Sequence, residues 1–305
     1  MKCSRSLILC YHRVAQGVDD PFLLCVTPAN FADQLDEIAR YGEPSTLNEL
    51  SVPSRRPRVV VTLDDGYADN LTNAVPIAQS KGFPITVFVT SGALGGTRGF
   101  WWDRLATLLR SRPTGVGEIC LPASEGTVRI GLGSFKASED LQSVRRYLLT
   151  LPVTEIHRVL DAVSEQWETS AEPPPDARSL TPSEFVQLAA SEVVTIGAHT
   201  VDHVRLRGLP ARDQLQTISS SRDELERLSG HVVSHFAYPY GGPDSFDDYS
   251  VNAARTTGFE TACTTIPGNV RDTSDPYRLP RRIVMNWGRL RFRVALQRWS
   301  LVPRH

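Results

Sequence analysis

The segment 59–67, VVVTLDDGY, constrains the fold of this chain more than any other stretch. Its first five residues form a largely apolar, β-branched run, which is typical of a strand buried on both faces of a parallel sheet. The run ends in two carboxylates, Asp64 and Asp65, and α/β folds bind ligands at this end of a strand. Successive strand side chains alternate, so the two carboxylates should point in different directions. The simpler interpretation is a strand that ends in an Asp-Gly turn.

Apolar strands alternate with amphipathic helices along most of the chain. The spacing predicts further strands over 6–11, 84–90, 192–198, 232–238, 261–265 and 279–285. It predicts helices over 28–41, 70–81, 182–190, 212–228, 250–257 and 289–301. Strand, helix and strand at this spacing form right-handed parallel crossovers, so the expected fold class is α/β.

The pattern changes between residues 92 and 180. Two or three helices, a hairpin around Glu125-Gly126 and a Pro-rich connector predict a mostly helical insertion or side lobe within a single domain, 1–305. Trp101 and Trp102 stand near its start. Indole rings stack on sugars, so these residues are candidates for substrate binding, and packing inside a helical lobe is the alternative.

Composition excludes several classes of protein. A formal net charge of −1 gives no general attraction to nucleic acid. The five scattered cysteines, with no CxxC pair, predict free thiols in a reducing compartment. No stretch approaches a membrane span, and the apolar run 7–10 is too short for a signal peptide. We therefore expect a cytoplasmic protein, although a chain trimmed at its start would show the same pattern.

A second constellation, HTVDH at 199–203, follows another apolar strand. Histidines four residues apart on one face suit two imidazole ligands on one cation, although two surface histidines would show the same spacing. Together with Asp65, His199 and His203 offer two nitrogens and one oxygen with positions left open. This set predicts a divalent metal, zinc first, with cobalt, nickel, manganese or iron as alternatives.

Three segments, TLDDG at 62–66, HTVDH at 199–203 and FAYPYG at 236–241, resemble the first three motifs of the polysaccharide deacetylases, carbohydrate esterase family four. The N-terminal LILCYHRV is similar to the subgroup of poly-N-acetylglucosamine deacetylases, in which the last family motif stands at the start of the chain. The resemblance implies a distorted (β/α) barrel and a metal-dependent enzyme that removes acetyl groups from N-acetylated sugars.

The resemblance also implies roles for the polar residues of these motifs. Asp64 would be the general base, His12 the general acid, and Asp65, His199 and His203 the metal ligands. Without the other motifs, His12 would be read as a partly buried histidine after a strand.

The third motif and a later arginine complete the expected site. The backbone N–H of Tyr240 would stabilise the oxyanion, with Pro239 and Gly241 fixing the turn, and a plain tight turn is the alternative. Tyr238, Pro239 and Gly241 are assigned to the substrate-binding rim. Arg281 matches the arginine that orients the base, and its neighbour Arg282 would take this role if the assignment is off by one.

Two positions depart from the family pattern. Leu63 stands where Phe is usual, and Ala237 stands where many members carry the arginine that pairs with the base. The pairing would then fall to an arginine near residue 281.

The predicted final helix mixes arginines with apolar residues between Arg289 and Arg304. Such a helix could lie on an anionic membrane, or it could close the barrel with its arginines in water. The sequence leaves the oligomeric state open.

We therefore expect a metal-dependent N-deacetylase acting on an N-acetylated sugar within a glycolipid, nucleotide sugar, oligosaccharide or glycosylated natural product. One alternative is hydrolysis of another amide, such as a formyl group or a cyclic ureide. Another is a catalytically silent carbohydrate-binding protein, although such a protein needs no base and acid around a metal.

Overall fold

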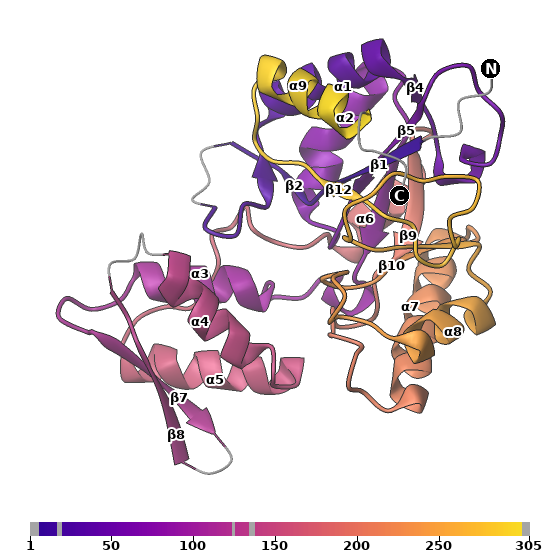
Figure 1. Ribbon diagram of the computed structural model, residues 1–305. Coiled ribbons are helices and arrows are strands. Elements are labelled where there is room, and N and C mark those ends of the chain that lie inside the picture. The colour runs from indigo at the N-terminus through magenta and orange to yellow at the C-terminus, as the bar shows by residue number, and fades with distance from the viewer. Residues whose placement is uncertain (1–5, 17–19, 124–125, 134–137, 301–305) are drawn as a thin grey trace. The chain divides into compact units, whose positions relative to one another are not determined.

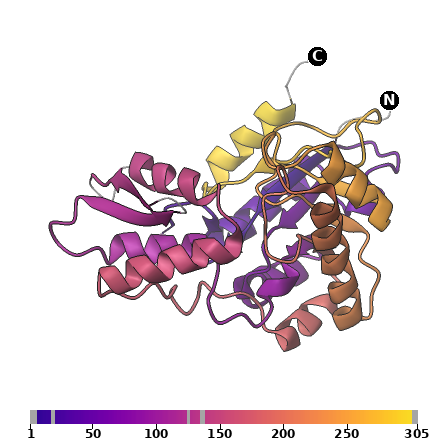
Figure 2. The same cartoon turned by 90° about the horizontal axis from the view of Figure 1, so that it is seen from below.

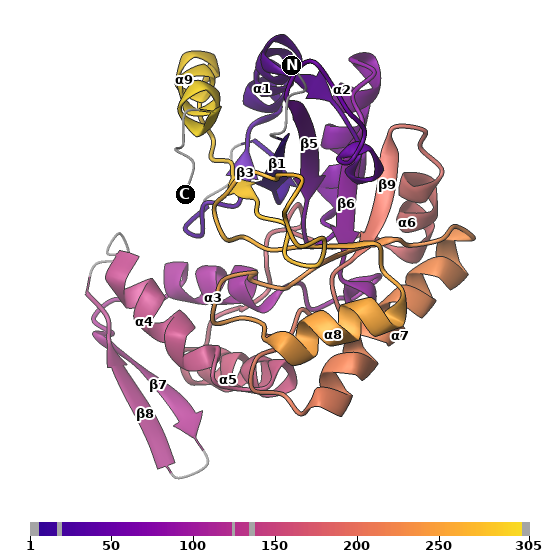
Figure 3. The ribbon, with the colours of Figure 1, turned by 45° about the vertical axis from the view of Figure 1, so that its right-hand side comes forward.

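The apolar run at residues 59–63 forms most of strand β5 (Arg58–Leu63), whose six residues are all buried. This strand lies inside a parallel sheet in the computed structural model, which describes residues 6–16, 20–123, 126–133 and 138–300. The strand order is β11-β10-β9-β6-β5-β1-β12, and β4 pairs with the N-terminal end of β5. Figure 3 shows β1, β5, β6 and β9 side by side.

The predicted elements are present to within a few residues, except as noted below, and the short strands over 13–14, 25–26 and 43–44 were not predicted. The strands are β1 (Ser6–Tyr11), β2 (Arg13–Val14), β3 (Cys25–Val26), β4 (Glu43–Pro44), β6 (Ile85–Val89), β7 (Glu118–Ala123), β8 (Gly126–Gly131), β9 (Val194–Ala198), β10 (His235–Ala237), β11 (Thr261–Cys263) and β12 (Arg282–Ile283). The α-helices are α1 (Pro28–Tyr41), α2 (Val75–Ser80), α3 (Trp101–Arg110), α4 (Ser138–Leu148), α5 (Val153–Gln166), α6 (Pro182–Ala189), α7 (Ala211–Ser229), α8 (Asp248–Thr257) and α9 (Arg289–Ser300). Short helical turns are η1 (Leu47–Glu49), η2 (Asn70–Ala74) and η3 (Ser91–Ala93).

Contacts divide the chain into two compact units. We call Met1–Leu94 with Leu180–His305 the barrel unit and Gly95–Ser179 the lobe. The lobe has nearly the bounds that the sequence predicts for an insertion, 92–180.

The barrel unit closes through the segment that leads into β12. Leu279 pairs with Cys263 of β11, and three residues later Arg282 pairs with Leu9 of β1. One segment therefore contacts both edges of the sheet, and the sheet curls into a distorted barrel. This observation confirms the predicted fold class. The predicted strand 279–285 is shorter than expected, because only Arg282 and Ile283 keep regular pairing.

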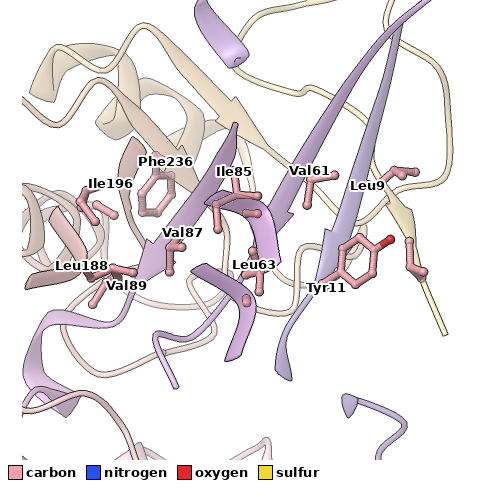
Figure 4. Close-up of a cluster of buried hydrophobic side chains, with 14 of the residues drawn as sticks. Leu9, Tyr11, Val61, Leu63, Ile85, Val87, Val89, Leu188, Ile196 and Phe236 are labelled. Atoms are coloured by element: carbon pink, nitrogen blue, oxygen red, sulfur yellow. The ribbon is translucent and has the colours of Figure 1, made fainter. Parts of the chain in front are cut away.

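Alternation along the strands produces two apolar cores. One set of side chains packs against the helices and includes the residues of Figure 4: Leu9, Tyr11, Val61, Leu63, Ile85, Val87, Val89, Leu188, Ile196 and Phe236. The opposite set fills the barrel interior and includes Ile8, Val60, Phe88, Ala237, Cys263 and Leu279. Full burial of one such large apolar side chain stabilises the fold by about 1.5–3 kcal/mol. The even-numbered residues of β5 therefore face the barrel interior, and Asp64 continues that series.

Local signals explain where several helices begin and end. The predicted capping box at the start of α6 is present, with Thr181 and Glu184 bonded reciprocally. Helices α7 and α8, which lie side by side in Figure 1, end at Gly230 and Gly258 with left-handed backbone. The predicted helix over 70–81 differs from expectation, because it starts with the π-helical turn η2 and becomes α-helical only at Val75.

The lobe contains α3, α4, α5 and the hairpin β7–β8, whose turn residues 124–125 lie outside the described residues. Helices α3 and α5 pack side by side (Figures 1 and 2). Trp101 and Trp102 in α3 are only 2% and 6% exposed, and the Trp102 ring stacks on Phe100. Their burial favours the packing interpretation over sugar stacking.

Helix α9 packs against α1 and buries Phe292 and Leu296. Two of its arginines, Arg289 and Arg293, donate hydrogen bonds to the carboxylate of Glu37 in α1. These contacts favour the closing-helix interpretation, and Arg304 lies outside the described residues. No helix in the described part of the chain is both long and apolar enough to span a bilayer.

Candidate active site

The polar residues singled out in the sequence gather at one edge of the barrel sheet. Asp64 and Asp65 follow β5, His12 follows β1, and His199 follows β9. Tyr240 follows β10 by three residues. Because these strands are parallel, their carboxyl ends meet at the same edge, and the residues after them face a common region.

Asp65, His199 and His203 form a compact cluster. Oδ1 of Asp65 lies 3.6 Å from Nε2 of His199 and 3.2 Å from Nε2 of His203. The ring centroids of the two histidines are 4.8 Å apart. All three side chains are buried, so the three ligand atoms converge in a place from which most water is excluded.

The chemistry of this cluster fits a divalent cation. Within the described residues, Oδ1 of Asp65 is buried and accepts no hydrogen bond, although two imidazole nitrogens stand close to it. Nδ1 of His199 lies 2.7 Å from the carbonyl of Ala237, so Nδ1 is the protonated nitrogen and Nε2 keeps its lone pair. Burial lowers the pKa of His199 to about 4, which keeps the imidazole neutral at pH 7. Two imidazole nitrogens and a carboxylate oxygen suit zinc and the other metals predicted from the sequence.

Asp64 turns away from this cluster and binds Arg281. Nη1 and Nη2 of Arg281 donate to Oδ1 and Oδ2 of Asp64 at 2.6 Å and 2.7 Å. Burial opposes ionisation of Asp64, but the charge of Arg281 holds its pKa well below the ordinary value. Arg282 instead donates to Asn269, so the structure selects Arg281 as the partner of Asp64.

Arg281 is itself held from several sides inside the barrel. It is fully buried and donates to the carbonyl of Thr264 and the hydroxyl of Thr62 at 2.9 Å and 3.0 Å. The Phe88 ring lies 5.5 Å from its guanidinium. A planar guanidinium fixed in this way presents two parallel donors and sets the orientation of the Asp64 carboxylate.

Cys10 also contacts this carboxylate, which the sequence analysis did not anticipate. Its Sγ donates to Oδ2 of Asp64 at 3.4 Å, and burial raises the pKa of the thiol, so it remains a protonated donor. The contact follows from the parallel register of β1 and β5, in which Cys10 pairs with Thr62, two residues before Asp64.

His12 lies beside the same pair. Cys10, His12 and Asp64 each bring one ligand-type atom within 4.8 Å of the others. The imidazole of His12 is only half-buried, whereas the other two side chains are buried. A group that can donate or accept a proton therefore stands next to the carboxylate of Asp64.

Backbone strain concentrates at these residues. Asp65, Thr200, His203 and Tyr240 have φ values of 76°, 63°, 53° and 61°, in the left-handed region that non-glycine residues rarely adopt. Each such residue costs about 1–3 kcal/mol and persists only where its surroundings fix it. Here Ser91 N–H and the Ser221 hydroxyl both donate to the carbonyl of Thr200.

The turn after β10 is also tightly specified. Gly241 has φ 63°, and a Cβ placed on it would stand 2.6 Å from the nitrogen of Thr265. Thr265 donates through its hydroxyl to the carbonyl of Tyr240 and through its N–H to that of Gly241. The Tyr240 ring packs edge-on against His203, with centroids 4.7 Å apart. Pro239 is buried in this turn.

Tyr238 does not present its side chain to a ligand. It is fully buried, stacks on Phe246 and donates its hydroxyl to the carbonyl of Tyr277. This burial argues against the predicted substrate-binding role of the Tyr238 side chain, because the alternation along β10 and the residue after it directs Tyr238 into the core against the helices.

Part of the chain resembles known proteins in sequence. Residues 146–262, which include the HTVDH and FAYPYG motifs, match the family model for polysaccharide deacetylases. YxkH from Bacillus subtilis (strain 168), named as a candidate polysaccharide deacetylase, is 27% identical over 92 residues. That alignment covers 30% of this chain and 32% of YxkH, so this chain spans about a third of the curated relative that it matches.

Solved structures share the fold over most of the chain. IcaB from Ammonifex degensii superposes with a TM-score of 0.62 at 18% identity, covering 97% of this chain and 98% of IcaB. The deacetylase PplD from Streptococcus pyogenes, solved with acetate, gives 0.59 at 17% identity over 92% and 93% of the two chains. BC0361, a polysaccharide deacetylase from Bacillus cereus, gives 0.60 at 16% identity over 97% of this chain and 69% of BC0361.

Proposed function

We propose that this chain, which matches the polysaccharide deacetylase family model over residues 146–262 and shares the fold of IcaB, removes the N-acetyl group from an N-acetylated sugar. The observation that carries the proposal is that two adjacent carboxylates have different neighbours. Asp65 faces two histidines, whereas Asp64 faces an arginine and stands beside a third histidine.

Asp65, His199 and His203 would hold the cation. When bound, a divalent cation supplies Lewis acidity that polarises the acetyl carbonyl and lowers the pKa of a nearby water. The burial of the three ligands would concentrate this effect on the reacting atoms.

Asp64 would act as the general base. Because Arg281 keeps its carboxylate ionised and oriented, Asp64 is ready to accept a proton from the attacking water at neutral pH. The water oxygen then forms a bond to the acetyl carbon. The N–H of Tyr240, held in a strained turn, would stabilise the negative charge that develops on the carbonyl oxygen.

His12 would complete the reaction as the general acid. An amine is a poor leaving group, so its nitrogen must gain a proton as the C–N bond breaks. The products are acetate and the free amino sugar. Specialisation of the chain within the poly-N-acetylglucosamine subgroup remains a prediction from LILCYHRV.

The test is acetate release from a panel of N-acetylated glycolipids, nucleotide sugars, oligosaccharides and glycosylated natural products. Metal-loaded protein should release acetate, and the chelated protein and the Asp64→Asn variant should lose this activity. Asp213→Asn removes an exposed carboxylate in α7 and serves as the matched control, with activity retained. If the site takes up metal and no acetyl sugar is cleaved, the acetyl-sugar assignment fails and formyl or ureide amides become the substrates to test. If no metal binds, the binding-protein alternative is favoured.

A further inference from the structure

The short segment that carries His12 is attached to the rest of the barrel unit by side chains from one neighbouring turn. Nδ2 of Asn70 donates to the carbonyl of His12 at 2.8 Å. Oδ1 of Asp69 accepts from the N–H of Val14 at 3.0 Å, and its Oδ2 accepts from Nε of Arg13 at 2.9 Å. The carbonyl of His12 is therefore held by Asn70, and the two residues that follow it are held by Asp69.

This attachment is buried and charged. Arg13 and Asp69 are 2% and 5% exposed, and Asn70 is fully buried. The guanidinium of Arg13 also lies 4.8 Å from the centroid of the Tyr67 ring. Removing either partner of a buried ion pair leaves the other charge without compensation, so this contact resists opening.

The π-helical turn η2 explains how the side chains reach the segment. Asp69 and Asn70 stand at its start, five and six residues after Asp64. A π turn is wider than an α turn and is frequent at functional sites. Nδ2 of Asn70 also donates to Oδ1 of Asp69 at 3.2 Å, so the two side chains support one another.

The ring of His12 depends on this attachment. Among the described residues, no hydrogen bond reaches its imidazole, in contrast to His199, whose ring is fixed by the Ala237 carbonyl. His12 lies in the single-residue gap between β1 and β2, whose flanking residues pair with β5 and β3, and its own carbonyl accepts from Asn70 in place of a neighbouring strand. Its direction toward Asp64 is therefore set through its own backbone.

We propose that Asn70, supported by the Asp69–Arg13 ion pair, is the positioning residue for the general acid His12. The inference rests on the proposed function, because it concerns the proton donor of that reaction. One segment, 64–70, would then supply the base, a metal ligand and the support for the acid. A general acid contributes about 10²–10⁴-fold to a rate, and part of that factor is lost when the acid is misplaced.

The test compares Asn70→Ala with Asn73→Ala, a matched control. Nδ2 of Asn73 donates to the carbonyl of Val14 at 2.7 Å, so the control removes the same type of bond two residues away. Each variant, in metal-loaded form, is assayed on an N-acetyl sugar and on an aryl acetate ester. The phenolate leaving group of the ester departs without a proton donor, whereas the amine of the sugar requires one.

We expect Asn70→Ala to lower kcat/KM for the amide by about tenfold or more and to lower the amide-to-ester ratio by a similar factor. Asn73→Ala should change both activities by less than about threefold. In a His12→Ala background, Asn70→Ala should cause little additional loss, because the two residues act as one unit. Equal losses on amide and ester, equal effects of the two Asn variants, or additive losses with His12→Ala would overturn the inference.

The outcome is separable from the proposed function. If wild-type protein loaded with metal cleaves neither substrate, the proposed function fails, and the positioning role is then judged from NMR signals of the His12 ring. Asn70→Ala should shift or broaden these signals while Asn73→Ala leaves them in place, and unchanged signals in Asn70→Ala would refute it. Asp69→Asn is a poor test, because it leaves the buried Arg13 without its counter-charge.

Discussion

The ion pair between Asp64 and Arg281 permits a quantitative test of the barrel interior. Arg281→Met removes the charge and keeps a flexible, unbranched apolar side chain. Asp64 then remains buried at 2% exposure with no guanidinium against it. The thiol of Cys10 and the remaining neighbours cannot replace two charge-assisted hydrogen bonds.

Breaking a buried pair by removing one partner costs about 3–5 kcal/mol of the free energy of unfolding. In the double variant Asp64→Asn with Arg281→Met neither charge of this pair is left, so the loss of stability should be smaller than in Arg281→Met alone. Arg282→Met is the matched control. Arg282 is half-buried and donates a long hydrogen bond of 3.4 Å to Asn269, so Arg282→Met should lower the free energy of unfolding by less than about 1 kcal/mol.

The dependence on pH follows from the direction of the pKa shift. In wild-type protein the pKa of Asp64 is depressed, so its contribution to stability is present above the unfolded pKa of 3.8 and is lost as pH falls below that value. In Arg281→Met burial dominates and raises the pKa of Asp64 above 3.8. The deficit of the variant should therefore be largest near pH 7 and should shrink toward pH 4.

Urea unfolding of metal-free protein, followed by circular dichroism at pH 7 and pH 5, measures these differences without a contribution from a bound cation. A loss below 1 kcal/mol in Arg281→Met, a double variant less stable than Arg281→Met, or a deficit that grows on acidification would contradict the interpretation of this pair.

Three further outcomes are expected. Gly241→Ala should lower acetate release about tenfold or more, because the added Cβ would stand 2.6 Å from a main-chain nitrogen and the residue has φ 63°. Gly242→Ala, whose Cβ would stand 3.7 Å from its nearest neighbour, should keep the wild-type rate of acetate release, and equal rates in the two variants would contradict this prediction. The hydrogen bonds from the α9 arginines, against the effect of burial, lower the pKa of Glu37 to about 2, so its stabilisation is present above about pH 4.5 and is lost as pH falls toward 2. An acid titration by circular dichroism should show a flatter stability profile over that range for Glu37→Gln, and an unchanged profile would contradict this assignment. His203→Ala should lower metal affinity at least tenfold in equilibrium dialysis with metal analysis, and exposed His231→Ala should match wild type; equal metal content in both variants would exclude His203 as a ligand.

Much of the site was predictable because its elements are local in the chain. Apolar β-branched runs identify the buried strands, and residues directly after parallel strands must meet at one edge of the sheet. This reasoning brings Asp65, His199 and His203 together before any coordinates are known. The spacing of apolar residues likewise predicts most helices and strands of the barrel unit within a few residues.

Other features depend on contacts between distant segments. The sequence assigned this role to Arg281 but left Arg282 open as the alternative, because the choice depends on how the segment after β11 crosses to β1. The position of Cys10 beside Asp64 depends on the register of two strands 54 residues apart. The π-helical start of the helix at residue 70 was missed, because local spacing does not distinguish a π turn from an α turn.

The sequence by itself therefore determined the fold class, the order of the strands along the chain and the residue types at the sheet edge, because these follow from short-range periodicity and from the chain direction of parallel strands. The tertiary structure alone decided which charged groups pair, which aromatic residues are buried and how the segment of His12 is held. Those properties depend on strand register, barrel curvature and side-chain packing between segments far apart in the chain, and no local pattern encodes them.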